Sequence, residues 1–208
     1  MIHPVRTLAA LLPLAGTLAL VTPPPAAAKA LFDAVEVDQS KFVIVSAPIG
    51  DGSRAQLNIY EQRSDAQPCY AVQGSNPAVV DPLLSTFDFT GICNRFIDGN
   101  GYSLRVGDSD LGTVYRLSVV KESGDTLLMA LPTKPSAGPE MVVARSGGSA
   151  NGFLLLVPEP GWKLMRRQFG GRTLGHVYVY RDSWPDAGTA ASAAPTEPPA
   201  PAAPAAGG

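Results

Sequence analysis

The stretch KFVIVSAPIGDGSRAQLNIYE, residues 41–61, sets the fold class of the chain. Two runs rich in β-branched and aromatic residues flank Asp51-Gly52, where glycine supplies the positive φ angle that a tight turn needs. In the second run, apolar and polar residues alternate with the two-residue period of a strand. The apolar residues are Ala55, Leu57 and Ile59, and the polar ones are Arg54, Gln56, Asn58 and Tyr60. The stretch therefore predicts a β-hairpin with two different faces.

Similar turn signals separate further strand-like runs. They stand at Asn100-Gly101, Ser123-Gly124-Asp125, Asn151-Gly152 and Gly170-Gly171. No long window shows the 3.6-residue period of an amphipathic helix, although the segment around Pro82 is compatible with one interrupted turn. The sequence thus predicts an all-β fold, an antiparallel β-sandwich or partly closed barrel built from hairpins, with at most a short helical turn near residues 78–86.

The first 30 residues have the pattern of a signal peptide. Arg6 precedes an apolar run over residues 8–21 that is short for a membrane span, and small residues allow cleavage after Ala28 or Ala30. An uncleaved N-terminal anchor is the alternative. We expect a signal peptide at residues 1–30, no transmembrane segment in the mature chain, and export to the periplasm, the cell surface or the medium.

The last 23 or so residues are nearly all Ala, Pro, Gly, Ser and Thr. Repeated prolines cannot donate backbone hydrogen bonds and favour an extended, solvated conformation. The composition therefore predicts a disordered tail over residues 186–208. Between the two ends, residues 31–185 have the size of a single β domain.

The charge balance argues against nucleic acid as a partner. The chain has 16 Lys and Arg against 18 Asp and Glu; loss of Arg6 and Lys29 with the signal peptide leaves 14 basic residues and a net charge of −4. A dedicated nucleic-acid binder normally needs an excess of basic residues to displace counterions from phosphates.

Cys69 and Cys93 are the two cysteines of the chain. In an exported protein an even cysteine count is read first as a disulfide, and a loop of this length contributes about 3 kcal/mol of stability. A zinc site would need further ligands, and a cysteine nucleophile would need a free thiol beside a base. A disulfide would pin the segment FDFTGIC, with Phe87 and Phe89 facing the core.

A candidate ligand-binding surface lies in the predicted hairpin GWKLMRRQFGGRTLGHVYVYR, residues 161–181, which mixes aromatic and basic side chains. Aromatic faces and guanidinium groups together stack on sugars or hold anionic polymers. The candidate residues are Trp162, Arg166, Arg167, Arg172, His176, Tyr178 and Tyr180. The alternative is an ordinary strand pair with aromatics inside and arginines in solvent.

Signals for catalysis or a metal are weaker. His176 is the one histidine outside the signal peptide, and either a general base or a hydrogen-bonded sheet histidine fits its position. GGSANG, residues 147–152, resembles a nucleophile elbow but lacks its second glycine. DGNGYSLRVGDSD, residues 98–110, departs from the calcium-loop pattern at two ligand positions, Tyr102 and Ser109, and at the required glycine, where Ser103 stands. We therefore assign no catalytic residue, no metal and no cofactor.

Several segments, among them GSNPAVVDPLLSTFDFTGIC and NGFLLLVPEPGWKLMRRQFGGRTLGHVYV, resemble a domain family of unknown function found in exported cyanobacterial proteins. The likeness spans about residues 32–182. It implies an exported, envelope-associated domain and brings no catalytic or binding residues with it.

Two hypotheses follow. The first is a non-enzymatic, disulfide-stapled binding or structural module of the cell envelope, whose partner is an envelope glycan or another envelope protein. The second is an envelope hydrolase that uses carboxylates or His176.

Overall fold

The hairpin at residues 41–61 forms the middle of a six-stranded sheet. Strand β2 (Phe42–Ile49) pairs antiparallel with β3 (Arg54–Gln62), and Phe42 lies opposite Glu61. Gly50 and Gly52 in the turn have φ angles of 60° and 81°, which glycine adopts without steric cost. The hairpin predicted from the sequence is confirmed.

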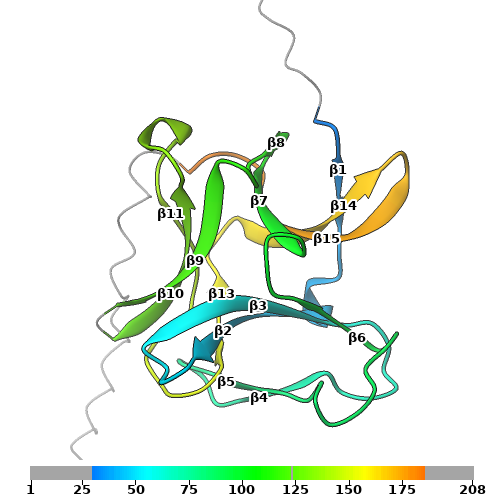
Figure 1. Cartoon of the computed structure of the whole chain (residues 1–208), viewed down its shortest axis with the longest axis vertical. Coiled ribbons are helices and arrows are strands. Elements are labelled where there is room, and N and C mark those ends of the chain that lie inside the picture. Colours follow the sequence, from blue (N-terminus) through cyan, green and yellow to red (C-terminus); the bar gives the residue numbers. More distant parts are fainter. Residues whose placement is uncertain (1–29, 123, 186–208) are drawn as a thin grey trace, which may run out of the picture.

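The computed structural model describes residues 30–122 and 124–185, so the predicted tail and nearly all of the predicted signal peptide lie outside the described residues. The six-stranded sheet has the order β4-β5-β12-β2-β3-β6 and curls into a half-barrel (Figure 1). Its other strands are β4 (Tyr70–Gln73), β5 (Val79–Pro82), β6 (Cys93–Phe96) and β12 (Leu154–Leu155).

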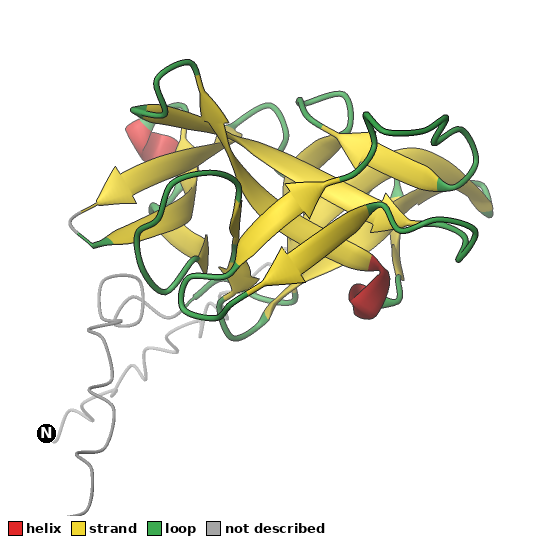
Figure 2. Cartoon of the chain, turned by 90° about the horizontal axis from the view of Figure 1, so that it is seen from below, coloured by secondary structure: helices red, strands yellow, loops and turns green. Residues whose placement is uncertain are grey.

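Two smaller sheets complete the described structure (Figures 1 and 2). The five-stranded sheet has the order β1 (Asp33–Glu36), β14 (Trp162–Phe169), β15 (Arg172–Arg181), β7 (Tyr102–Val106) and β8 (Ser109–Asp110). The four-stranded sheet has the order β13 (Val157–Pro158), β11 (Met141–Arg145), β10 (Asp125–Pro132) and β9 (Tyr115–Glu122).

The all-β prediction is confirmed, with three details that differ from the simplest hairpin arrangement. The pair β15–β7 is parallel. Asn151-Gly152 does not close a hairpin, because β11 and β12 belong to different sheets. Residues 79–82 are strand β5, and short 3-10 turns occur instead at η1 (Gln39–Lys41) and η2 (Pro135–Ala137). In the described residues, no helix is long and apolar enough to cross a membrane.

Strand β2 is buried on both faces, which explains its uninterrupted apolar run. Phe42 and Ile44 enter a large core cluster to which all three sheets contribute. Val43 and Val45 face the other way, into a second cluster inside the half-barrel. A strand with two buried faces needs apolar residues at every position, whereas one with a single buried face alternates.

The disulfide between Cys69 and Cys93 is present, and its Cα atoms are 5.8 Å apart. Both cysteines are buried in the cluster inside the half-barrel, where Phe87 and Phe89 pack against them, while Asp88 is exposed. The bridge ties the segment before β4 to the start of β6. Both sulfur atoms are therefore committed to structure.

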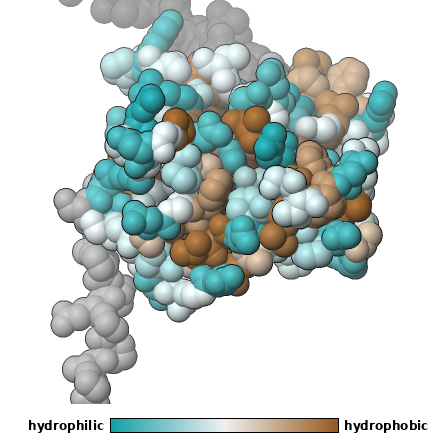
Figure 3. Space-filling model, turned by 60° about the horizontal axis from the view of Figure 1, so that its bottom comes forward, coloured by the Kyte–Doolittle hydropathy of each residue, from teal (hydrophilic) through white to brown (hydrophobic). Residues whose placement is uncertain are grey.

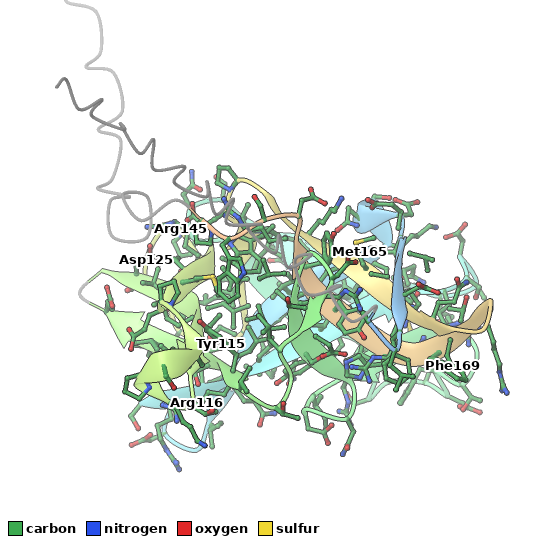
Figure 4. All side chains as sticks on the ribbon, turned by 90° about the horizontal axis from the view of Figure 1, so that it is seen from above. Tyr115, Arg116, Asp125, Arg145, Met165 and Phe169 are labelled. Carbon is green, nitrogen blue, oxygen red and sulfur yellow. A yellow bond between two sulfur atoms is a disulfide. The ribbon has the colours of Figure 1, made fainter. Side chains whose placement is uncertain are left out.

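A loop beside the four-stranded sheet is organised around one carboxylate. Asp125 Oδ1 accepts hydrogen bonds from the backbone N–H groups of Gly147 and Gly148, at 3.0 and 3.2 Å. Arg145 Nη1 lies 3.4 Å from Asp125 Oδ2, at the end of the molecule away from Phe169 (Figure 4). Asp125 thus holds the first two residues of the GGSANG segment in a structural loop.

Candidate functional site

The aromatic–basic residues predicted as a ligand-binding surface do not form one exposed face. Arg172 is exposed, and Arg167 and Tyr180 are half-buried. The remaining four are buried: Trp162, Arg166, His176 and Tyr178. The sequence alternation assigned each side chain to one of the two faces of the hairpin. It did not reveal that side chains on both faces are buried. A ligand on the surface therefore has little access to them.

Arg166 lies between sheets rather than in solvent. Its Nη2 is 2.6 Å from Glu61 Oε1 on β3, and the two side chains are 9% and 14% exposed. The guanidinium carbon is 5.6 Å from the ring centroid of Phe42 and 5.3 Å from that of Phe96. Its charge is thus neutralised inside the protein, where it joins the five-stranded sheet to the six-stranded sheet.

The other face of the five-stranded sheet brings His176 and Ser103 together. Ser103 Oγ is 2.9 Å from His176 Nε2, and His176 Nδ1 is 2.8 Å from the carbonyl oxygen of Asn100. A carbonyl oxygen only accepts, so the ring proton is on Nδ1 and Nε2 accepts from the Ser103 hydroxyl. Burial lowers the pKa of His176 below its usual value, and nearby Arg167 adds to this effect, so the ring is neutral near pH 7.

Three further side chains complete this outer-face cluster, which comprises Ser103, Asp110, Arg167, His176 and Tyr178. Arg167 donates from Nε to Tyr178 Oη at 2.7 Å and from Nη2 to Asp110 Oδ2 at 2.9 Å. Tyr178 Oη donates to the same Asp110 oxygen at 2.7 Å. Burial and the bond to Asp110 raise the pKa of Tyr178, which keeps its hydroxyl protonated as a donor.

The buried, neutral His176 predicts a pH-dependent stability. In the unfolded chain its pKa returns to about 6.5, so the unfolded state binds protons more readily than the folded state in the interval below that value. The free energy of unfolding should therefore decrease as the pH falls from 7 to 5, by at most about 1.4 kcal/mol per pH unit from this residue. Above pH 7 its contribution should be constant.

Urea unfolding at several pH values measures this effect, and the H176Q variant is the matched control. The difference in unfolding free energy between the two proteins should change with pH below 7, since the glutamine does not titrate. Parallel pH profiles for the two proteins would contradict the assignment.

Two acidic side chains of the segment at residues 98–110 have partners within the protein. Asp98 Oδ1 accepts from the backbone N–H groups of Asn100 and Gly101, at 2.9 and 3.3 Å, and Asp110 is paired with Arg167. Among the residues that the structure describes, no group of three or more His, Cys, Asp or Glu side chains is placed to hold a metal ion.

A groove of about 660 Å³ lies on the half-barrel, a site that the sequence analysis did not identify. Strands β2 to β6, the turn at residues 84–85 and the loop before β12 surround it. Its lining residues are Ala47, Pro48, Gln56, Asn58, Tyr60, Gln73, Val79, Val80, Asp81, Pro82, Leu84, Ser85, Arg95, Gly152 and Phe153. Figure 3 views the molecule from the side of β4 and β5, where polar and apolar side chains are interspersed.

One wall of the groove is an ordered row of polar side chains on β3. Gln56 Nε2 donates to Asn58 Oδ1 at 3.2 Å, and Asn58 Nδ2 donates to Tyr60 Oη at 2.9 Å. Asn58 and Tyr60 are buried, while Gln56 is exposed at the open end. The row fixes which amide atoms remain available to a ligand.

The other walls carry both charges and apolar surface. Gln73, Asp81 and Arg95 are exposed there, and Phe153 is half-buried. Amide, carboxylate and guanidinium groups match the hydroxyl groups of a sugar as donors and acceptors, and an aromatic ring matches its C–H face. The groove can therefore bind a polar ligand of the size of one or two sugar rings.

One signal for this groove was visible in the sequence. Gln56, Asn58 and Tyr60 occupy the polar face of the strand at residues 54–62. Arg54 begins this face, and the two amides and the tyrosine that follow it are uncharged, which is compatible with a polar face that is partly covered. The segment that covers it, β4 and β5, could not be inferred from periodicity.

Comparison with known proteins gives one family match. A family model described as "Protein of unknown function (DUF3747)" matches residues 7–184, which includes most of the segment predicted as a signal peptide and stops before the Ala/Pro-rich end. No curated protein and no solved structure matches the chain.

Proposed function

The chain belongs to the DUF3747 family of proteins of unknown function, and from this premise we propose that it is a glycan-binding module of the cell envelope. The observation that carries the proposal is the groove on the half-barrel, in which an ordered amide–tyrosine row faces exposed charged and aromatic side chains. Amide, hydroxyl, carboxylate and guanidinium groups line this groove together, and such a set of donors and acceptors is suited to binding a sugar.

The groove favours an uncharged saccharide over an extended polyanion. Arg95 and Asp81 line it together, so the formal charges of its exposed side chains cancel. Planar amides at Gln56 and Gln73 donate and accept at the same time, as vicinal hydroxyl groups require. An anionic polymer would instead need several unpaired cations along one face.

Calorimetric titration with neutral oligosaccharides, together with co-sedimentation with peptidoglycan, tests the proposal. The double variant Q56A/R95A should weaken binding at least tenfold, because each change removes an exposed hydrogen-bonding group, about 1 kcal/mol or more apiece. R116A, which removes an exposed arginine on β9, is the matched control and should bind like the wild type.

Two outcomes would reject this site. One is the absence of binding to every saccharide tested, and the other is full binding by a folded Q56A/R95A variant. Thermal unfolding of each variant separates loss of binding from loss of fold.

We also propose that the protein is exported. The pattern of residues 1–30 and the disulfide support this, because disulfides persist in oxidising compartments. N-terminal sequencing of the mature protein from the envelope fraction should find Lys29 or Leu31 as the first residue, according to which cleavage position is used. An intact N-terminus in that fraction would favour an uncleaved anchor instead.

A further inference from the structure

Ser103 and His176 have the arrangement of a nucleophile and its general base. Strands β7 and β15 run parallel with Ser103 opposite Tyr178, so His176, two residues before Tyr178, projects on the same face as Ser103. The Ser103 hydroxyl donates to His176 Nε2 at 2.9 Å, and the Asn100 carbonyl holds the ring from its other side at 2.8 Å. This is the relation in which a histidine removes a proton from a serine, with a third group orienting the ring.

The electrostatic surroundings favour negative charge on the serine oxygen. Arg167 Nη2 lies 3.3 Å from Ser103 Oγ, so a cation stands beside the atom that would become an alkoxide. The guanidinium is held by Tyr178 and Asp110 and therefore keeps its position. A fixed cation next to a developing oxyanion lowers the barrier to its formation without reorganisation.

Gly112 packs closely against Ser103. A Cβ atom on Gly112 would lie 3.0 Å from Ser103 Cβ and 3.5 Å from Ser103 Oγ. Ser103 is 8% exposed and His176 7%, so access is narrow. Access this narrow limits any substrate to one with a small acyl group.

We propose that Ser103 is a nucleophile that accepts small acyl groups from esters, with His176 as its general base. Ser103 Oγ bonds to the ester carbonyl carbon while its proton passes to His176 Nε2; the C–O bond to the alcohol breaks and the alcohol leaves with that proton. Water then attacks the acyl-serine and gives its proton to Nε2; the acyl C–O bond to Ser103 breaks, Oγ takes the proton back from Nε2, and the carboxylic acid leaves. This site lies on the five-stranded sheet and is independent of the groove.

Methanesulfonyl fluoride, whose only carbon group is a methyl, probes the serine directly, since attack by Oγ forms a Ser–O–S bond and releases fluoride. Intact-mass analysis of the wild-type protein should show one added methanesulfonyl group, and peptide mapping should place it on Ser103. The S103A variant should not be labelled. H176Q should be labelled at least about 100-fold more slowly than the wild type, the usual size of general-base assistance. p-Nitrophenyl acetate should be hydrolysed with the same dependence on both residues.

Two further variants sharpen the test. S109A removes an exposed hydroxyl on the same β7–β8 hairpin and should be labelled like the wild type, whereas G112A should slow labelling because its methyl group would crowd Ser103. A wild-type protein that is not labelled, a label on another serine, or unchanged labelling of folded H176Q would each overturn the proposal. The first two outcomes count even if H176Q does not fold.

Discussion

Replacement of Arg166 by methionine is expected to lower the free energy of unfolding by about 3–5 kcal/mol, the range for removing one partner of a buried ion pair. The substitution keeps most of the side-chain length and removes the charge. Glu61 would then be left 14% exposed with no cation at Oε1, where Arg166 Nη2 now lies at 2.6 Å. Asn94 Nδ2, 2.6 Å from Oε2, would still hydrogen-bond the carboxylate but cannot neutralise it.

The loss of stability in R166M should come from the carboxylate of Glu61, which is left without its cation. A second replacement, E61L in the R166M background, removes the stranded carboxylate and should restore part of the stability, because a buried pair can often be replaced by apolar residues at little cost. Urea unfolding of the two single variants and the double variant gives the coupling energy directly. R116M, at an exposed position on β9, is the control and should change stability by less than about 0.5 kcal/mol.

A cost below about 1 kcal/mol for R166M would show that Arg166 is not held in the interior as described. This prediction also bears on any binding assay. A variant at Arg166 that loses ligand binding would first have to be shown to be folded, since the residue joins two sheets.

Local features of the fold were predictable because short-range chemistry determines them. Gly52 supplies a positive φ at the β2–β3 turn, and Gly170 does so at the β14–β15 turn. The alternation of Leu57 and Ile59 with Asn58 correctly separated two faces of β3. The order of strands was not predictable, since side-chain periodicity specifies the face of a residue but not the strand beside it. The parallel pairing of β15 with β7 is one such long-range choice.

In the candidate site, too, local features were predictable and long-range contacts were not. Sequence alternation placed His176 and Tyr178 on one face, as the structure does, but Ser103 joins them from 73 positions away. Arginines were expected in solvent because charged groups are rarely buried unless paired. The partner of Arg166 is 105 positions away, so the sequence alone offered no sign of its burial. Contacts at such distances depend on the whole fold.

Removal of the disulfide is the other change with a large expected effect. The C69A/C93A double variant should lose about 3–4 kcal/mol of unfolding free energy, because the bridge closes a loop between cysteines 24 positions apart and restricts the unfolded chain. Replacing both residues avoids an unpaired thiol, and alanine keeps a small apolar group at two buried positions. Guanidinium unfolding of the oxidised wild type and the variant measures the difference.

The same variant should affect the groove before the whole protein unfolds. The disulfide anchors the start of β6, which carries Arg95, and lies next to the segment that contributes Leu84 and Ser85. Saccharide binding by the double variant should therefore weaken under conditions where its circular dichroism remains that of a β protein. The core formed by all three sheets does not include either cysteine, so it should persist. If the variant matched the wild type in both stability and binding, the half-barrel would be held by its apolar cluster alone, and the bridge would have no part in shaping the groove.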